Sequence, residues 1–309
     1  MTQAFVVHII YSVEVYMLDG ILPVFKPEGI SSYDLIRRIK SILGKQAKYE
    51  KIGHGGTLDP MATGVILILF GEATKCFQFL LDNGKEYIAW IKFGAFTTTD
   101  DKTGEVIERS SKVVCREDVE KVLFKFSGKI LQTPPYFSAV KIDGVRSYEI
   151  AREGKGIELK PREVEIYKIE LLDFDNEKNL AKFYIICSSG TYIRSIARDL
   201  GKELKTGGYL EALVRTKDGG IKLEDCYKIE EIESSRLEKL LLPVKPFISY
   251  PSIEWGGSED FVKNGKKLYV SMLGKDFLND GKYTLTKGDK LLAIIEKNGK
   301  EIRYLRVFL

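Results

Sequence analysis

A glycine-crowded segment at residues 53–64, GHGGTLDPMATG, runs directly into the wholly apolar stretch VILILF at 65–70. Glycine adopts backbone angles that other residues resist, and proline fixes its own φ, so Asp59 and the following Pro60 are expected to lie on a stiff loop. The apolar stretch predicts a buried strand. Any fold for this chain must therefore place one firmly held carboxylate at the edge of a central strand.

This loop does not match the common phosphate-binding patterns. A Walker A loop needs Lys-Ser or Lys-Thr after its glycines, and the dinucleotide-binding fingerprint needs a third glycine where this chain has Leu58. An Asp-Pro pair between glycines is usually only a turn. Other parts of the chain have to decide whether Asp59 is more than a turn residue.

Hydrophobic periodicity indicates an α+β fold. Helical spacing of apolar residues predicts helices at 31–43, 73–81, 116–126 and 191–205. Strands are predicted at 65–70, 85–93, 164–174 and 181–187.

The stretch 243–251 contains three prolines and is the best candidate for a domain boundary. Behind it, short strand-like stretches are separated by Asn-Gly or Asp-Gly pairs, which are hairpin-turn signals. These pairs lie at 264–265, 280–281 and 298–299. The pattern predicts a small C-terminal β-barrel.

Composition limits the possible classes without choosing among them. The chain has 309 residues, 44% of them hydrophobic, which suffices for one large domain and a smaller one. Its net charge of +4 says little about a polyanionic partner. Basic residues nevertheless cluster just before the glycine-rich loop, opposed only by Glu50. Such a run is usually a solvated face, with a phosphate-binding track as the alternative. The cluster consists of Arg37, Arg38, Lys40, Lys45, Lys48 and Lys51.

The four cysteines and two histidines give no zinc-site spacing, because no Cys-x-x-Cys pair occurs and the only histidines are His8 and His54. Free thiols, the lack of a secretory signal pattern and the lack of a bilayer-length apolar run predict a cytoplasmic protein that does not enter a membrane. With no metal-ligand spacing and no nucleotide-cradling loop, we expect neither a metal nor a cofactor.

Five segments, in order between about residue 20 and residue 220, resemble the TruB family of tRNA pseudouridine synthases. Residues 53–64 are similar to the family's catalytic motif. The other four are similar to its opening strand with a Lys-Pro turn, its active-site tyrosine strand with the following loop, its RNA-gripping insertion and its arginine motif. They lie at 20–32, 85–104, 132–154 and 187–201. A series in this order is far more specific than one loop.

The resemblance implies the pseudouridine-synthase fold, in which helices flank a large mixed, mainly antiparallel sheet. It places the catalytic domain at residues 17–246, with the insertion at about 128–155. A weaker similarity to the PUA RNA-binding domain covers 251–309, and residues 1–16 are expected to be an N-terminal extension.

The same resemblance assigns three residues to catalysis. Asp59 is the catalytic carboxylate, and Arg194 is its ion-pair partner. Tyr87 stacks on the uracil and could take its C5 proton, although a tyrosine on an alternating strand is also an ordinary core residue.

A second group is implied to contact substrate or RNA. His54 fills the space left by extruded bases, and Leu213 lines the pocket, where plain core packing would look the same. Lys26 braces the site or is a solvated turn lysine, and Tyr192 packs on the nucleotide or within its helix start. From the insertion, the group includes Lys141 and Arg152.

Pseudouridine formation breaks the C1′–N1 bond of uridine, rotates the detached base and rejoins it through C5, with no external reagent. A carboxylate serves this reaction by covalent attack or by assisting a sugar intermediate. The resemblance leaves open whether Asp59 attacks the sugar, attacks the base or works through a glycal-like route.

The expected function is isomerisation of uridine 55 in the T stem-loop of tRNA, by base flipping, in a monomer that needs no protein partner. A guide-RNA-dependent synthase of the archaeal and eukaryotic type and a non-catalytic tRNA-binding protein are the alternatives. Two segments depart from the family pattern, TTT at 97–99 and VRTK at 214–217. The second leaves fewer positive charges, which puts the affinity for tRNA in question.

Overall fold

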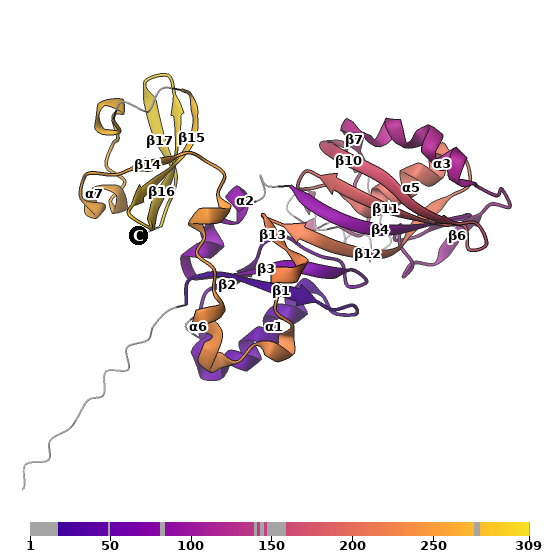
Figure 1. The fold of residues 1–309 in the computed structure, drawn as a ribbon, viewed down its shortest axis with the longest axis horizontal. Coiled ribbons are helices and arrows are strands. Elements are labelled where there is room, and N and C mark those ends of the chain that lie inside the picture. The colour runs from indigo at the N-terminus through magenta and orange to yellow at the C-terminus, as the bar shows by residue number, and fades with distance from the viewer. Residues whose placement is uncertain are drawn as a thin grey trace, which may run out of the picture.

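The computed structural model describes residues 18–48, 50–80, 84–138, 141–142, 145–146, 159–274 and 279–308. Within them the chain forms a large sheet flanked by helices and a separate small sheet near the C-terminus (Figure 1). This confirms the α+β class predicted from periodicity. The proposed extension, 1–16, lies outside the described residues.

The large sheet has nine strands among the described residues. Its main path runs β1-β3-β12-β4-β11-β10-β7, with β2 added to β3 and β13 to β12. Only the pairing of β12 with β3 is parallel in this sheet as described, so it is mixed and mainly antiparallel, as predicted. The strands are β1 (Gly20–Lys26), β2 (Ile52–His54), β3 (Thr63–Phe70), β4 (Lys85–Phe93), β7 (Gly128–Gln132), β10 (Arg162–Asp175), β11 (Leu180–Cys187), β12 (Gly208–Asp218) and β13 (Ile221–Lys222).

The helices and two short ribbons complete this unit. The ribbons are β5 (Ala95–Thr97) with β6 (Val106–Arg109), and β8 (Lys141–Ile142) with β9 (Val145–Arg146). The helices of the whole described chain are α1 (Ser32–Leu43), α2 (Phe77–Leu80), α3 (Arg116–Val122), α5 (Ile193–Glu203), α6 (Leu237–Leu240) and α7 (Glu259–Lys263).

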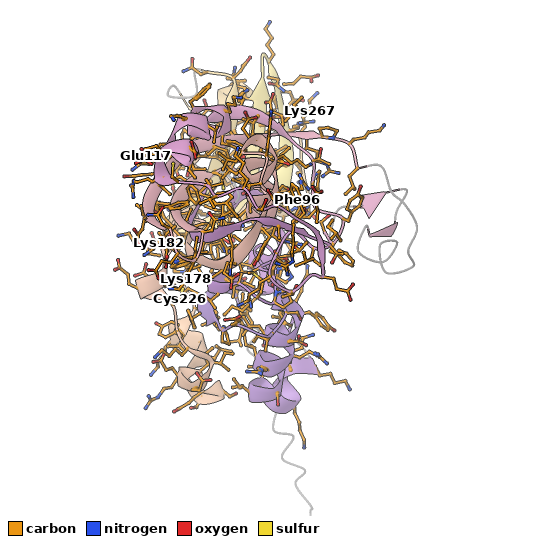
Figure 2. The ribbon with its side chains drawn as sticks, turned by 90° about the vertical axis from the view of Figure 1, so that its right-hand side faces the viewer. Phe96, Glu117, Lys178, Lys182, Cys226 and Lys267 are labelled. Carbon is orange, nitrogen blue, oxygen red and sulfur yellow. The ribbon has the colours of Figure 1, made fainter. Side chains whose placement is uncertain are left out.

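Around β4 and β11 one face of the large sheet is buried and the other is half-exposed, whereas β1 and β3 are buried on both faces. Buried and half-exposed side chains alternate along β4 and β11. On the buried face α5 packs so closely on β12 that a Cβ on Gly208 would lie 2.5 Å from the Ala197 carbonyl oxygen. On the outer face the Lys182 ammonium, labelled at the edge of the molecule in Figure 2, lies over the Trp90 ring. The main core therefore lies between the sheet and α5.

Two of the four predicted helices are interrupted. Residues 73–81 contain the end of a 3₁₀ turn, Gly71–Lys75, and then the single turn α2. The Thr74 hydroxyl donates to the Gly71 carbonyl at 2.7 Å, a local bond that competes with a regular helix. The prediction at 116–126 is divided into α3 and a 3₁₀ turn, Leu123–Phe126, whereas the other two predicted helices are α1 and α5.

The C-terminal sheet has the order β14-β15-β16-β17. Among the described residues, Asn298-Gly299 is the one predicted turn that joins two paired strands. The prediction was wrong for Asn264-Gly265, which ends α7: Gly265 has φ +60° and its N–H bonds the Val262 carbonyl at 2.9 Å. The strands are β14 (Ser252–Glu254), β15 (Gly281–Lys287), β16 (Lys290–Asn298) and β17 (Glu301–Val307).

The two sheets meet through a shared apolar cluster. Ile294 and Phe308 from the C-terminal unit pack with Ile21, Leu69 and Phe79 of the larger unit. These five side chains are at most 8% exposed. The two units therefore share a buried apolar contact. The predicted domain bounds, 17–246 and 251–309, remain proposals.

Candidate active site

The Asp59 loop is fixed by contacts on both sides of the carboxylate. Before it, the Ser32 hydroxyl accepts from the Leu58 N–H at 3.0 Å and donates to the Leu58 carbonyl at 3.1 Å. After it, the Pro60 carbonyl accepts from the Lys26 ammonium at 3.3 Å. Ser32 begins α1 and Lys26 ends β1, so two separate elements hold the loop.

Lys26 lies behind this loop and is completely buried. Its ammonium also donates to the carbonyls of Pro27 and Ile30, each at 2.8 Å. Burial lowers the pKa of Lys26 to about 8, while the nearby Asp59 carboxylate opposes the shift. The geometry is that of a brace, and the alternative of a solvated turn lysine does not apply.

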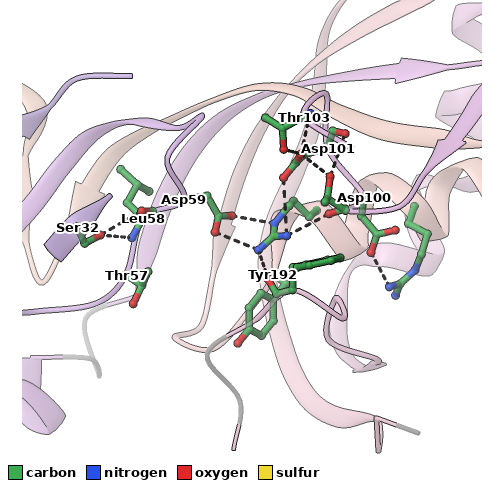
Figure 3. A network of polar contacts seen from close by, with 12 residues as sticks. Ser32, Thr57, Leu58, Asp59, Asp100, Asp101, Thr103 and Tyr192 are labelled. Atoms are coloured by element: carbon green, nitrogen blue, oxygen red, sulfur yellow. Dashed lines mark hydrogen bonds and ion pairs between the residues drawn. The ribbon is translucent and has the colours of Figure 1, made fainter. Parts of the chain in front are cut away.

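Asp59 is paired with Arg194, which comes from the first turn of α5 (Figure 3). Nη2 donates to Oδ1 at 3.0 Å, and Nε lies 2.8 Å from Oδ2 in an ion pair without hydrogen-bond alignment. The Asp59 side chain is 31% exposed, whereas that of Arg194 is 5% exposed. One side of the carboxylate is therefore held, and the other remains open to a ligand.

The remaining donors of Arg194 tie two further loops to the site. Nη1 donates to the Thr99 carbonyl at 3.1 Å and Nη2 to the Phe137 carbonyl at 3.0 Å. Nη1 also lies 3.7 Å from Oδ2 of Asp101. Asp101 is itself fixed by the Thr99 hydroxyl at 2.7 Å and the Thr103 N–H at 2.9 Å (Figure 3).

Asp101 is a site residue that the sequence analysis missed. It is 4% exposed and stands next to the arginine that holds Asp59. A signal was available, because Asp101 lies within the loop after the tyrosine strand that resembles a family motif. Its neighbour Asp100 pairs with Arg198 of α5 at 2.9 Å, so this loop is anchored on the same helix as Arg194.

Tyr87 is buried beside the loop. It is 6% exposed and belongs to the same apolar cluster as Leu58, Met61 and Leu213. Burial raises the pKa of Tyr87, and the guanidinium of Arg215 beside it opposes this rise. The phenol is therefore neutral at physiological pH. Leu213 lies in the same cluster, a placement that core packing alone would also give.

Arg215 changes the interpretation of the segment at 214–217. The sequence pattern links the charges of this segment to tRNA affinity, but the Arg215 side chain is only 1% exposed. It donates to the Val65 carbonyl at 2.7 Å and pairs with the buried carboxylate of Asp218 at 3.2 Å. This arginine cannot reach phosphates because it lies beneath the Asp59 loop.

The structure describes the surroundings of His54 and Tyr192, but not those of the two predicted contact residues from the insertion. His54 on β2 is half-buried, and burial lowers its pKa, which favours the neutral imidazole. The backbone N–H and carbonyl of Tyr192 bond the Gln132 side chain at 2.8 and 3.1 Å, and burial raises the pKa of the Tyr192 phenol. The side chain of Lys141 and all of Arg152 lie outside the described residues.

The basic cluster at 37–51 is on the surface. All six of its side chains are exposed. Glu50, the acid within the run, is buried instead, and both of its carboxylate oxygens accept from the Leu18 N–H at 3.2 Å. Its carboxylate thus binds the backbone at Leu18.

In the part of the chain that the structure describes, no group of three or more His, Cys, Asp or Glu side chains is placed to bind a metal ion. None of the helices described there is both long and apolar enough to cross a bilayer.

Comparison with known families and relatives gives a consistent result. Residues 40–193 match the model of the N-terminal domain of TruB family pseudouridylate synthases. A protein of Francisella philomiragia named tRNA pseudouridine synthase B is 40% identical over 287 residues, which are 90% of this chain and 91% of that one. A protein of the same name from Rickettsia akari is 44% identical over 230 residues, 74% of this chain and 78% of its own.

Solved structures with the same fold include Cbf5 chains. In the crystal structure of a Cbf5-Nop10-Gar1 complex, the matching chain is 25% identical with a TM-score of 0.69, covering 94% of this chain and 85% of that one. A chain from the archaeal box H/ACA sRNP Nop10-Cbf5 complex has a TM-score of 0.69 at 22% identity, covering 96% of this chain and 88% of its own. These matches confirm the fold class predicted from the sequence.

Proposed function

The chain belongs to the TruB family of pseudouridylate synthases, and we propose that it isomerises uridine 55 in the T loop of tRNA to pseudouridine. The observation that most supports this proposal is the Asp59 carboxylate, 31% exposed and fixed by a buried arginine. An oriented carboxylate with one open side is what the cleavage of the C1′–N1 bond requires.

In the proposed reaction, Asp59 acts on the flipped uridine either as a nucleophile or by assisting loss of the base from C1′. The base turns, its C5 bonds to C1′, N1 gains a proton and C5 loses one, so atoms and electrons balance without an added reagent. Arg194 orients the carboxylate through two contacts. The choice between sugar attack, base attack and a glycal-like route stays open.

Tyr87 is assigned to contact with the uracil. Burial raises its pKa, and a neutral phenol is a poor proton acceptor. Of the two roles that the resemblance implies, stacking therefore fits this environment better than removal of the C5 proton. Leu213, in the same cluster, is proposed to line the pocket against the base.

RNA positioning is assigned to the exposed basic cluster and to the insertion at 132–154. A T-loop uridine is stacked within folded tRNA and must be extruded before it reaches Asp59. His54 is proposed to fill the space that the base leaves. We propose that the T stem-loop suffices as substrate, that the enzyme is a cytoplasmic monomer, and that it needs no protein partner, metal or cofactor.

A partner-dependent synthase is the second candidate. The fold is shared with a chain found in a Cbf5-Nop10-Gar1 complex, at 25% identity over 94% of this chain. The two candidates differ in whether the protein by itself modifies tRNA.

Tritium release from a [5-³H]uridine-labelled tRNA transcript, with purified protein alone and EDTA present, tests the proposal. We expect release from the full transcript and from an isolated T-arm hairpin, and none from a matched transcript with cytidine in place of the target uridine. Release that requires an added RNA or protein would favour the second candidate. Binding of tRNA without any release would point to a non-catalytic tRNA-binding protein.

A further inference from the structure

A β-bulge in β12 brings three charged side chains together under the Asp59 loop. Arg215 lies opposite Tyr87 on β4, but the next paired residues are Lys217 with Glu86, so Thr216 is an extra residue in β12. In a regular strand, residues three apart point to opposite faces of the sheet. The extra residue turns Asp218 to the same buried face as Arg215, as bulges do when they redirect a side chain.

Asp218 is shared by two cations on that face. Its Oδ2 lies 3.1 Å from the Lys85 ammonium and 3.2 Å from Nη2 of Arg215. The side chains of Lys85, Asp218 and Arg215 are 8%, 2% and 1% exposed. Taking three charges out of water is costly. The two ion pairs stabilise the fold only if the distances and angles between the charged groups are favourable.

The guanidinium of Arg215 spans the segment that carries Asp59. Its Nε donates to the Val65 carbonyl at 2.7 Å, beyond the end of the loop. Its Nη1 donates to the Thr57 carbonyl at 3.3 Å and its Nη2 to the Gly56 carbonyl at 3.5 Å, before Asp59. One side chain thus contacts the backbone on both sides of the carboxylate and also lies beside the Tyr87 hydroxyl.

The residues around Arg215 leave no room for a side chain at two glycines of the loop. A Cβ on Gly64 would lie 2.2 Å from the Arg215 carbonyl oxygen, and a Cβ on Gly56 would lie 2.6 Å from the Lys85 ammonium. Both glycines also have positive φ, at +111° each. The loop is therefore shaped to fit closely against β12 and the buried charges.

We propose that Arg215 and Asp218 are positioning residues for catalysis. Asp218 orients Arg215, and Arg215 holds the two ends of the Asp59 loop in place relative to Tyr87. Neither residue touches the substrate; both act through Asp59 and Tyr87. This inference rests on the proposed function, because it needs a reaction whose rate can be measured.

Arg215→Lys is the first test. A lysine keeps a positive charge beside Asp218 but cannot contact carbonyls at 56, 57 and 65 together. We expect the single-turnover rate constant at saturating T-arm hairpin to fall by about 10- to 100-fold, the range for small misplacements of a catalytic group. The Kd for the hairpin should stay within about threefold of wild type, because Arg215 is only 1% exposed.

Lys217→Arg is the matched control. Lys217 neighbours the bulge but faces the half-exposed side of the sheet, where it pairs with Glu86 at 3.2 Å. The exchange is of the same chemical kind at nearly the same point of β12. Its rate constant should equal that of wild type.

A second variant covers the case in which Arg215→Lys does not fold. The double change Lys85→Met with Asp218→Asn removes one cation and one anion, so the net buried charge is conserved while Arg215 loses its orienting carboxylate. We expect the rate constant per folded molecule to fall while the Kd is retained. A wild-type rate in folded Arg215→Lys, or in the folded double variant, would overturn the inference. An inactive wild-type protein would instead refute the proposed function.

Discussion

In the C-terminal unit, the pairs Lys290–Glu259, Lys297–Asp280 and Arg303–Glu296 each have one side chain that is more than half exposed, whereas in the large sheet the pairs beneath the Asp59 loop are buried. The Lys290–Glu259 pair has side chains that are 54% and 37% exposed, against 1% and 2% for Arg215–Asp218. The interior of the C-terminal unit is an apolar cluster that includes Trp255.

The difference indicates which part of the molecule depends on exact polar geometry. Apolar packing tolerates changes that preserve volume, but a buried charge without its partner is strongly unfavourable. We therefore expect substitutions near the loop to alter the rate, and substitutions in the C-terminal unit to alter stability and RNA binding.

The largest effect is expected for Asp59→Asn. Asparagine keeps the shape of the side chain but cannot act as a carboxylate, so turnover should fall at least about a thousandfold. The fold should be retained, because Asp59 is 31% exposed and Arg194 keeps its bonds to the Thr99 and Phe137 carbonyls. Tritium release and thermal unfolding of the same preparation check both statements. Near-normal turnover would remove Asp59 from the mechanism.

Phe308→Ala tests the C-terminal unit. Phe308 is 8% exposed in the cluster that joins the two units, and truncation of a buried phenylalanine costs about 3–5 kcal/mol. Urea unfolding should show this loss, and tRNA binding should weaken while the rate constant at saturating RNA stays near wild type. Phe124→Ala is the matched control, since Phe124 is 72% exposed. Equal stability of the two variants would contradict the shared cluster.

Substitutions of the neighbouring residues Ser32 and Ser31 distinguish support of the Asp59 loop from stability of helix α1. Ser32→Ala removes both bonds to the Leu58 backbone and should reduce the rate about tenfold or more, with a stability loss of about 1–3 kcal/mol. Ser31→Ala removes the N-cap of α1 and should cost about 1 kcal/mol with an unchanged rate. The ratio of the single-turnover rate constants is the measurement. If the two variants react equally fast, the Ser32 contact does not position Asp59.

The smallest effect concerns the pH dependence of stability through Lys26. Burial lowers its pKa from 10.5 to about 8, so between these values the unfolded chain binds more protons than the folded one. This group therefore makes the free energy of unfolding rise with pH from about 8 to 10.5. Urea unfolding of wild type and Lys26→Met across this range should show a shallower rise for the variant. Parallel curves would mean that Lys26 titrates normally.

Much of the fold followed from patterns that are local in the chain. Alternation and helical spacing located β3, β4, β10, β11 and the helices α1 and α5, because each depends only on neighbouring residues facing one core, but they did not predict β12. Periodicity failed where a local bond competes with the helix, as at Thr74, and where Asn264-Gly265 ended a helix. Motif resemblance identified Asp59 and Arg194, which the structure brings together from 135 residues apart.

The sequence by itself therefore determined four strands and two helices of the large unit, the family and the carboxylate of the proposed site. Only the tertiary structure decided what supports that carboxylate: Ser32 behind Leu58, Asp101 beside Arg194, and the cluster around Arg215. The last of these depends on strand register and on one extra residue in β12, which redirects Asp218 to the buried face. No local pattern encodes this cluster, because its partners meet only after distant strands have paired. The bulge then determines on which face of the sheet each side chain lies.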